Sequence, residues 1–581
     1  MHVNKLRPLA PYLLGFLVFV FWVNYITSDT FNPFNDKYYA IHKPIDAWKI
    51  YQLNKQHIIP VPYHFDLKIE DLEGGQFYSY PDPPLSYIAG YILSWTIPAQ
   101  AAGKYFFIVK LLAFINYSAS FVLLIVLLRK LKIDHTVAYF ISMTVFSSFR
   151  FWEYLSYLHL SGIWVLILPL IAYLNFKESP SRKNSLALGI SLFIGLSQDI
   201  YFGVGVALFV LLPVVLVLLS VTRMSIRKGI ILASVILLTF MVPFILLKGQ
   251  DVYSVFNTGF QDPTARSPGY RSIMAYRPWY HFIPTPDSKI FGFLYDTVRS
   301  LIYNLPFLDK TTLLSPVSEI TEYISYLLIA LTLFLAVVKR QYLTGLGKWA
   351  LAFTVLIFVY MKPDFWLNGR HFVLPSNRIQ NALGLITTLR IANFTILLFF
   401  IALAFLISKI HNKKLAVAVS IFVFMIGFLE HSRPTSTPCT TSLDGNFINY
   451  IKTSGPIKRI SFELPKCLAN MTDILANGLD DPNLLDGRYY QIYHHEPIYA
   501  PDSVSWLDFY RYIPPLSKIR NLSGVFSGSN IAVLDRLNIK EIDVLVQGYN
   551  AADFYSDYLN ALDKTGWEKV FFKDAIVFKL K

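Results

Sequence analysis

The stretch Pro83–Ile97, PPLSYIAGYILSWTI, decides how the chain is folded. It is apolar throughout, like a buried or membrane-spanning helix. However, a helix needs roughly 20 apolar residues to cross the hydrocarbon core of a bilayer, and this stretch is clearly shorter. Whether it spans the membrane or lies at its surface determines on which side every later loop falls.

The composition places the chain in a membrane. Of its 581 residues, 54% are hydrophobic and only 15% are charged. Repeated apolar runs of helix-spanning length predict a polytopic α-helical membrane protein. The formal net charge of +14 is accounted for by short cationic loops, and the sequence holds no nucleic-acid-binding motif. We therefore expect membrane lipids, and no nucleic acid, among its partners.

Short cationic loops fix the predicted topology, because such loops stay on the cytoplasmic side. They are RKLKIDH (129–135), NFKESPSRKN (175–184), TRMSIRKG (222–229), VKRQYLTGLGK (338–348) and SKIHNKK (408–414). If residues 83–97 crossed the membrane, the RKLKIDH loop would break this rule. We therefore predict that residues 83–97 lie in the membrane interface or re-enter from the outer side.

About eleven spans remain, each close to the length that a bilayer requires. They are expected near 9–27, 105–128, 135–149, 160–175, 184–198, 201–221, 228–247, 317–338, 347–361, 392–408 and 414–430. The first follows the basic head MHVNKLR and lacks a small-residue cleavage site, so we interpret it as a retained signal anchor with a cytoplasmic N-terminus.

Four segments then lie outside the cytoplasm: 28–104, 248–316, 362–390 and 431–581. The last carries β-like runs such as RISFELP and WEKVFFKDAIVFKL between turn signals. We predict two domains, a membrane domain over 1–430 and an extracytoplasmic α/β domain over 431–581. Cys439 and Cys467 lie in this second part, where they either form a disulfide or remain two buried thiols.

Charged side chains with candidate chemistry gather on the predicted outer face. Asp36 and Asp46 follow the first span, Glu153 lies between the third and fourth, and Asp199 lies in a very short turn between the fifth and sixth. Arginines occupy the other outer segments: Arg266, Arg271, Arg277, Arg370, Arg378 and Arg390. Arginines at membrane ends commonly extend to lipid headgroups, and loop acids are commonly only solvated. Asp199 differs because an acid that close to hydrocarbon tends to be paired or functional.

A carboxylate combined with arginines beside a bilayer suits transfer of a sugar from a lipid phosphate. Arginines bind phosphate through forked, charge-assisted hydrogen bonds and stabilise the charge of a leaving phosphate. The carboxylate accepts the proton of the attacking hydroxyl. The loop histidines His42, His57 and His64 lack tight metal-ligand spacing, so the metal requirement stays open between none and one divalent ion.

Two short motifs resemble the GT-C superfamily of membrane glycosyltransferases, which includes protein O-mannosyltransferases and aminoarabinose-type lipid A transferases. FNDKYYA (34–40) is similar to the acid followed by Tyr-Ala after the first helix, and YSYPDPPLSYIAGYIL (78–93) is similar to the segment that begins a juxtamembrane helix. The family pattern has two adjacent acids, whereas here Asn35 precedes Asp36. The stretch LPSNRIQNALGLITTLRIANF (374–394) and the C-terminal strands also resemble YfhO-like bacterial membrane proteins.

The resemblance implies an inverting glycosyltransferase with a polyprenyl-phosphate-linked sugar as donor. Asp36 would be the general base, with Asp46 as its substitute, and Glu153 would position the acceptor or a metal. Substrate contacts are expected from Tyr39, His42, Tyr80, Pro84, Asp199, Arg271, Arg277, Arg378 and Arg390. The acceptor would be a glycan, lipid or protein of the cell envelope.

Two other functions remain open at this point. A transporter or flippase of lipid-linked saccharides would also need an apolar groove and arginines, but no carboxylate beside the first helix. A non-catalytic membrane protein with a glycan-binding outer domain is the third possibility. Substitution of Asp36 distinguishes them, because only an enzyme would lose turnover while still binding the lipid.

Overall fold

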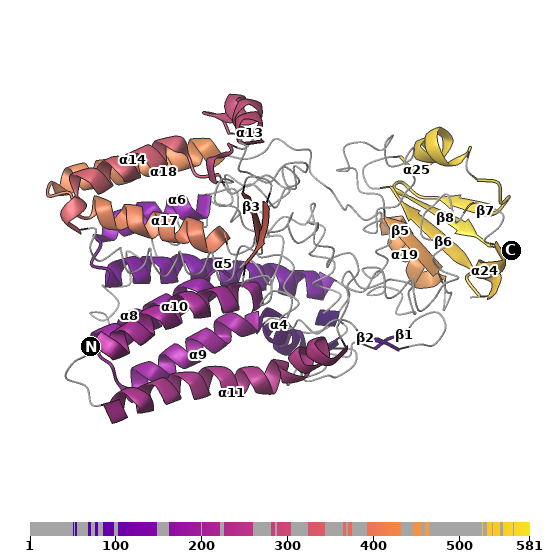
Figure 1. Cartoon of the computed structure of the whole chain (residues 1–581). Helices are drawn as coiled ribbons and strands as arrows, with labels where there is room; N and C mark the ends of the chain where they lie inside the picture. The colour runs from indigo at the N-terminus through magenta and orange to yellow at the C-terminus, as the bar shows by residue number, and fades with distance from the viewer. Residues whose placement is uncertain are drawn as a thin grey trace, which may run out of the picture. The chain divides into compact units, whose positions relative to one another are not determined.

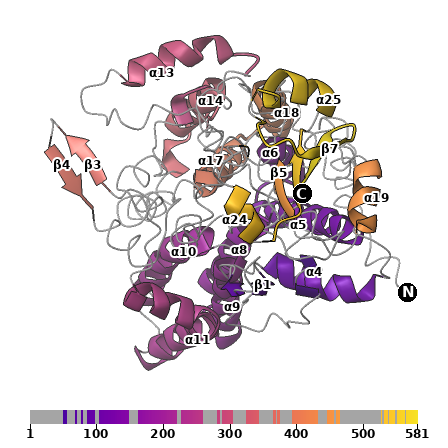
Figure 2. The same ribbon diagram turned by 90° about the vertical axis from the view of Figure 1, so that its right-hand side faces the viewer.

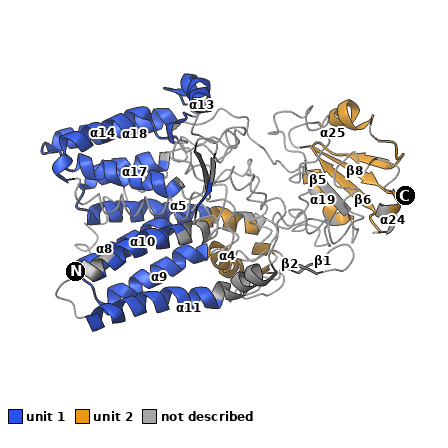
Figure 3. Ribbon diagram, viewed as in Figure 1, with its two compact units in different colours: residues 1–26, 113–155, 159–435 blue, residues 27–112, 156–158, 436–581 orange. Residues whose placement is uncertain are grey.

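A computed structural model describes a mostly helical chain, as the sequence predicts (Figure 1). The residues that it describes are 50–51, 53–54, 68–70, 76–78, 85–97, 103–147, 162–198, 200–220, 226–258, 281–284, 288–303, 323–342, 364–367, 370–374, 392–431, 445–454, 459–463, 526, 531–536, 538–546, 550–561 and 563–580. The chain forms two compact units, coloured separately in Figure 3. Unit 1 comprises 1–26, 113–155 and 159–435, and unit 2 comprises 27–112, 156–158 and 436–581.

The described helices of unit 1 lie close to the predicted spans. They are α5 (Gly103–Lys130, in this unit from residue 113), α6 (His135–Ser147), α8 (Trp164–Glu178), α9 (Arg182–Gln198), α10 (Ile200–Ser220), α11 (Ile226–Thr258), α14 (Tyr326–Val338), α17 (Ala392–Ile407) and α18 (Lys413–His431). The spans expected at 9–27 and 347–361 lie outside the described residues. The count of eleven and the sidedness of the loops therefore stay predictions.

Within the described part of the chain, two of these helices are long and apolar enough to cross a membrane. They contain the apolar segments Phe107–Lys130 and Ile226–Leu246. Shorter apolar segments occur in α6, α10, α14 and α17. α14 is shorter than the span predicted at 317–338, because the helix begins at Tyr326, after the extended residue Ser325.

The helices of unit 1 pack in two neighbouring sets. α9 packs against α8, α10 and α11, whereas α6 packs against α17 and α18 and α14 contacts both of these. Aromatic side chains mark the contacts, such as Phe209 of α10 against Phe394 of α17, with ring centroids 4.8 Å apart. Outside the bundle, unit 1 includes the one-turn helix η3 (Gly292–Leu294), helix α13 (Tyr295–Tyr303), η6 (Arg340–Tyr342) and a hairpin of β3 (Asp364–Leu367) and β4 (Arg370–Val373).

Unit 2 joins the first predicted outer segment with the C-terminal part. The first contributes β1 (Lys68–Glu70), β2 (Gln76–Tyr78), α4 (Leu85–Thr96) and the beginning of α5. The second contributes α19 (Gly445–Thr453), β5 (Arg459–Glu463), α24 (Ile531–Arg536), β6 (Glu541–Leu545), α25 (Ala551–Phe554), β7 (Glu568–Phe571) and β8 (Ala575–Lys579). Buried side chains of both parts, including Tyr87, Leu112, Phe447 and Val577, belong to one hydrophobic cluster.

The C-terminal strands form a mixed sheet in the order β5-β6-β8-β7. β5 pairs parallel to β6, and the other pairs are antiparallel. Every residue of β6 is buried, as are the first four of β8, because both are central strands. This explains why they read as nearly continuous apolar runs, IDVLV and AIVF, without strict alternation.

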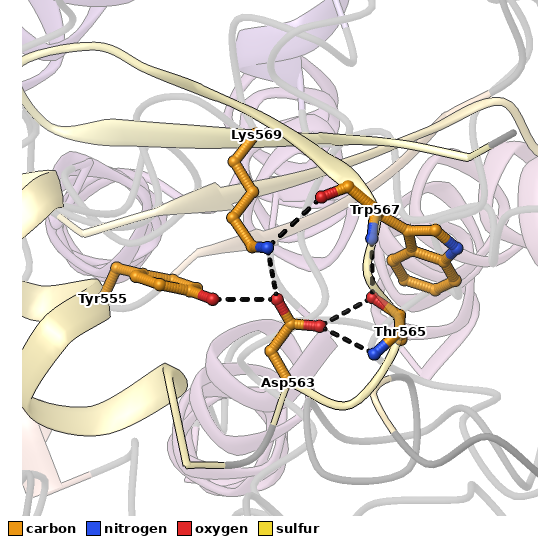
Figure 4. Close-up of polar contacts among 5 residues, drawn as sticks. All are labelled: Tyr555, Asp563, Thr565, Trp567 and Lys569. Carbon is orange, nitrogen blue, oxygen red and sulfur yellow. Dashed lines mark hydrogen bonds and ion pairs between the residues drawn. The ribbon is translucent and has the colours of Figure 1, made fainter.

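One buried carboxylate stabilises the turn that leads into β7 (Figure 4). Asp563 accepts hydrogen bonds from the Tyr555 hydroxyl at 2.9 Å and from the Thr565 hydroxyl at 2.6 Å, and it pairs with Lys569 Nζ at 2.8 Å. Burial by itself would raise the pKa of the Asp563 carboxyl, but these donors, Lys569 foremost, lower that pKa below its usual value. The same pairing raises the pKa of Lys569 against the opposing effect of burial.

Candidate functional site

The side chains predicted to carry the chemistry lie outside the described residues. They are Asp36, Asp46, Glu153, Tyr39, His42, Tyr80, Pro84, Asp199, Arg271, Arg277, Arg378 and Arg390, together with the cysteines Cys439 and Cys467. Their roles stay predictions. The structure does describe helices and strands that flank these residues in sequence.

The motif helix α4 is short, as the predicted interfacial position requires, although the predicted spans α6 and α14 have only 13 residues each. It begins at Leu85, directly after the two prolines of the motif, and has 12 residues. At 1.5 Å per residue it extends about 18 Å, against a hydrocarbon core of roughly 30 Å. One face is buried and includes Tyr87 and Tyr91, whereas Ile92 and Trp95 on the other are 58% and 63% exposed. This two-sided pattern is typical of a helix that covers a hydrophobic core, and the buried face belongs to the cluster of unit 2.

The buried face of α4 packs against the residues that follow Asp46 in sequence. A Cβ atom on Gly90 would lie 2.6 Å from Cδ1 of Ile50, so no larger residue fits there without a shift. The Asn54 side-chain amide donates to Ser94 Oγ at 2.6 Å, and the Tyr105 hydroxyl of α5 donates to Asn54 Oδ1 at 3.4 Å. These contacts hold residues 50–54, α4 and the start of α5 in one arrangement.

Two tyrosine rings complete this contact. Tyr51 and Tyr105 meet edge to face with centroids 5.5 Å apart. Burial, with a smaller contribution from the neighbouring Tyr105, raises the pKa of Tyr51 to about 12. Tyr51 therefore stays neutral at physiological pH and serves as a packing residue here, not as a base.

A second polar contact joins α5 to the beginning of α8. Asn116 Oδ1 accepts from the Trp164 indole N–H at 3.1 Å, and Ser120 Oγ accepts from the Trp164 backbone N–H at 2.9 Å. The hydroxyl of Tyr117 donates to the carbonyl of Phe146, near the end of α6, at 2.7 Å. α5 thus fixes the end of α6 and the start of α8, and Glu153 lies between these two helices in sequence.

The helices on either side of Asp199 leave only this one position between them, because α9 ends at Gln198 and α10 begins at Ile200. The two helices approach so closely that a Cβ on Gly203 would lie 2.1 Å from Cα of Leu196. Gln198, next to Asp199 in sequence, is completely buried.

Two buried polar side chains were not anticipated from the sequence. Asn393, three residues after Arg390 at the beginning of α17, is fully buried, and its amide atoms have no hydrogen-bond partner within the part of the chain that the structure describes. Glu430, in the last turn of α18, is 1% exposed. The only sequence feature that could have indicated either residue is its position as a polar residue at one end of an apolar helix.

Hydroxyl groups from distant parts of the chain surround Glu430. Ser288 donates to Oε2, Ser325 donates to Oε1 at 3.0 Å, and Tyr323 makes a further side-chain hydrogen bond. Ser288 precedes η3, and Ser325 is the N-cap residue of α14. Glu430 therefore joins the end of α18 to the beginning of α14 and to the segment before α13. Within the described residues, no group of three or more metal-ligating side chains occurs.

Comparisons with known proteins found similarity to solved structures. No protein-family profile and no curated sequence matches the chain. The oligosaccharyltransferase AglB from Archaeoglobus fulgidus, solved with an inhibitory peptide and a dolichol-phosphate, aligns with a TM-score of 0.47 and 12% identity over 96% of this chain and 71% of that one. ArnT from Cupriavidus metallidurans, bound to undecaprenyl phosphate, aligns with a TM-score of 0.43 and 13% identity over 97% of each chain.

Both solved structures are GT-C superfamily glycosyltransferases. With TM-scores below 0.5 and identities of 12% and 13%, these two matches identify no residue of the site.

Proposed function

We propose that this chain is a membrane glycosyltransferase that moves a sugar from a polyprenyl-phosphate-linked donor to a cell-envelope acceptor on the extracytoplasmic side. Asp36 is the general base, and Asp46 is its substitute. Arg271, Arg277, Arg378 and Arg390 bind the donor phosphate, while Glu153 and Asp199 orient the acceptor and donor. If the reaction uses a divalent metal, Glu153 would be a ligand.

The observation that carries the proposal is the arrangement of α4. The motif that resembles GT-C transferases opens a short helix, and this helix is packed against residues 50–54 and the start of α5. We expect a first outer segment built in this way to hold the acids before residue 50 near the membrane surface, where a lipid phosphate lies. A soluble loop would place them at no fixed depth.

The proposed reaction is a single displacement. The acceptor hydroxyl attacks the anomeric carbon, and its proton moves to the Asp36 carboxylate as the new bond forms. The bond between the anomeric carbon and the phosphate oxygen breaks with its electron pair on that oxygen. The arginines stabilise the negative charge that develops on the leaving polyprenyl phosphate. The product is inverted at the anomeric carbon.

The test compares Asp36→Asn with Asp66→Asn, a matched change of an acid in the same outer segment outside the motif. Envelope glycans of cells with and without the protein are first compared by mass spectrometry to identify the transferred sugar. Asp36→Asn should then reduce transfer by about 10²-fold or more, because a positioned base contributes that much. Binding of undecaprenyl phosphate should be unchanged in both variants.

The alternatives give different results. If Asp36→Asn keeps full transfer while Asp46→Asn abolishes it, Asp46 is the base. If neither acid affects the glycans but deletion of the protein does, the chain moves or binds lipid-linked saccharides without catalysing transfer, and the proposal fails.

A further inference from the structure

Residues 292–303, which form η3 and α13, present apolar side chains to their surroundings although they lie outside the predicted spans. Phe293 of η3 and Leu301 of α13 are 78% and 64% exposed, whereas Ile302 is buried. Single exposed apolar side chains are common on protein surfaces, and these two gain meaning only from the position of η3 and α13 beside the spans.

The depth of this helix is fixed by the ends of two spans. Ser288, four residues before η3, donates to Glu430 at the end of α18. The Tyr326 hydroxyl of α14 donates to the Phe282 carbonyl at 2.6 Å, and its ring meets that of Phe291 at 5.1 Å. The opposite ends of α14 and α18 carry the cationic loops 338–348 and 408–414. α13 is therefore attached where the two spans leave the membrane on the outer side.

The orientation of α13 suits a membrane surface. α14 and α18 run lengthwise in Figure 1 and are viewed along their axes in Figure 2. α13 is viewed along its axis in Figure 1 and lies lengthwise in Figure 2. It thus runs across the direction of the spans, in the plane of the predicted membrane surface.

The apolar surface of the spans continues to the level of α13. α14 exposes Leu327, Leu333 and Phe334, and α18 exposes Phe422 and Leu429. Leu327 and Leu429 lie within one turn of the ends that hold the Ser325–Glu430 hydrogen bond. The hydrogen bonds of Ser288 and Tyr326 attach the segment of Phe293 and Leu301 to these same helix ends.

We propose that η3 and α13, residues 292–303, lie on the membrane surface, with Phe293 and Leu301 inserted at the headgroup–acyl boundary of the outer leaflet. Glu430 sets its depth through Ser288. Lys289, which is exposed, and Arg299, which lies over the Tyr295 ring at 5.8 Å, provide the cations that such helices place at the headgroups. The proposal needs the membrane location but not glycosyl transfer, so it stands or falls separately from the proposed function.

Spin labels test the proposal in the full-length protein. Cys439 and Cys467 are replaced by Ser, and single cysteines are introduced as Phe293→Cys, Leu301→Cys, Leu333→Cys and Asp557→Cys. The protein is placed in vesicles of phosphatidylcholine and phosphatidylglycerol, and collision of each label with oxygen and with a water-soluble nickel chelate is measured. Leu333 on α14 is the lipid-facing control, and the exposed Asp557 in the C-terminal part is the aqueous control.

Labels at 293 and 301 should favour oxygen over the nickel chelate more strongly than the label at 557 does, at a depth shallower than that of the label at 333. Introducing Glu430→Gln should shift the depth of the label at 293 and leave 333 unchanged. Nickel accessibility equal to that at 557 would overturn the proposal. Low collision with both reagents would show that a protein surface, such as a second copy, covers this face, and would overturn it as well.

Discussion

Glu430 and Asp563 are both carboxylates almost completely removed from water, yet the chain surrounds them in different ways. Glu430 is 1% exposed and lies among hydroxyl groups contributed by residues 142 and 105 positions away in sequence. Asp563 has a side-chain exposure of 1%, and its partners Tyr555, Thr565 and Lys569 all lie within eight residues.

The difference concerns both what is held together and how the charge is balanced. Glu430 connects three elements of unit 1 that are far apart in sequence, so its hydrogen bonds are tertiary contacts. Asp563 connects one turn to the strand that follows it and has the Lys569 ammonium at 2.8 Å. In the described residues, the partners of Glu430 are hydroxyls, which stabilise a buried charge less well than a cation does.

The largest effect is therefore expected at Glu430. Glu430→Ala should lower the free energy of local opening around residues 288–303 and 323–331 by about 3 kcal/mol, because buried serine hydroxyls lose their acceptor and a cavity remains. Hydrogen exchange of these peptides, followed by mass spectrometry in detergent, measures the change.

Glu178→Ala is the matched control, since Glu178 is also the last acid of an apolar helix, α8, but is exposed. That change should alter exchange by less than about 0.5 kcal/mol. If both variants behave alike, Glu430 does not hold the three elements together, and the contrast with Asp563 disappears.

Local features of the fold could be predicted from the sequence, whereas contacts between distant residues could not. Hydropathy runs placed the helices well: the span expected at 105–128 is α5 at 103–130, and the β-like run near the C-terminus contains β7 and β8. Helix ends were less accurate. α11 continues to Thr258, beyond the predicted end at 247, because a polar sequence such as KGQD can extend a helix past its apolar part.

The buried polar contacts could be anticipated only where they are local. Asp563, Thr565 and Gly566 form a recognisable turn pattern, with the φ angle of Gly566 at +67°. No spacing rule connects Glu430 to serines more than a hundred residues away, so only the folded structure brings them together. The catalytic assignments at Asp36, Asp46 and Glu153 also depend on long-range convergence, and they remain sequence-based predictions because these residues lie outside the described part of the chain.

A double-mutant cycle on Asp563 and Lys569 would sharpen the local side of the comparison. Asp563→Asn and Lys569→Met, alone and together, should give a coupling free energy of about 1 kcal/mol, since one partner is buried and the other is 22% exposed. Exchange protection of the peptide covering β7 and β8 is the readout. The exposed pair Lys579–Glu568, at 3.6 Å, serves as the control and should show a coupling close to zero. Equal coupling for the two pairs would mean that burial of Asp563 adds nothing.

The smallest effect should come from pH, because titration removes only the charge and leaves the Tyr555 and Thr565 contacts partly in place. The folded pKa of Asp563 lies below its unfolded value, so its stabilising effect is complete above the unfolded pKa, near 4, and is lost as pH falls further. The folded pKa of Lys569 lies above its unfolded value, so its contribution is present below about pH 10 and is lost as pH rises through the folded value. Protection of β7 and β8, corrected for intrinsic exchange rates, should thus decline at both extremes in the native protein. In the Asp563→Asn, Lys569→Met double variant both declines should become shallower, and an unchanged profile would show that other groups control the pH response of this sheet.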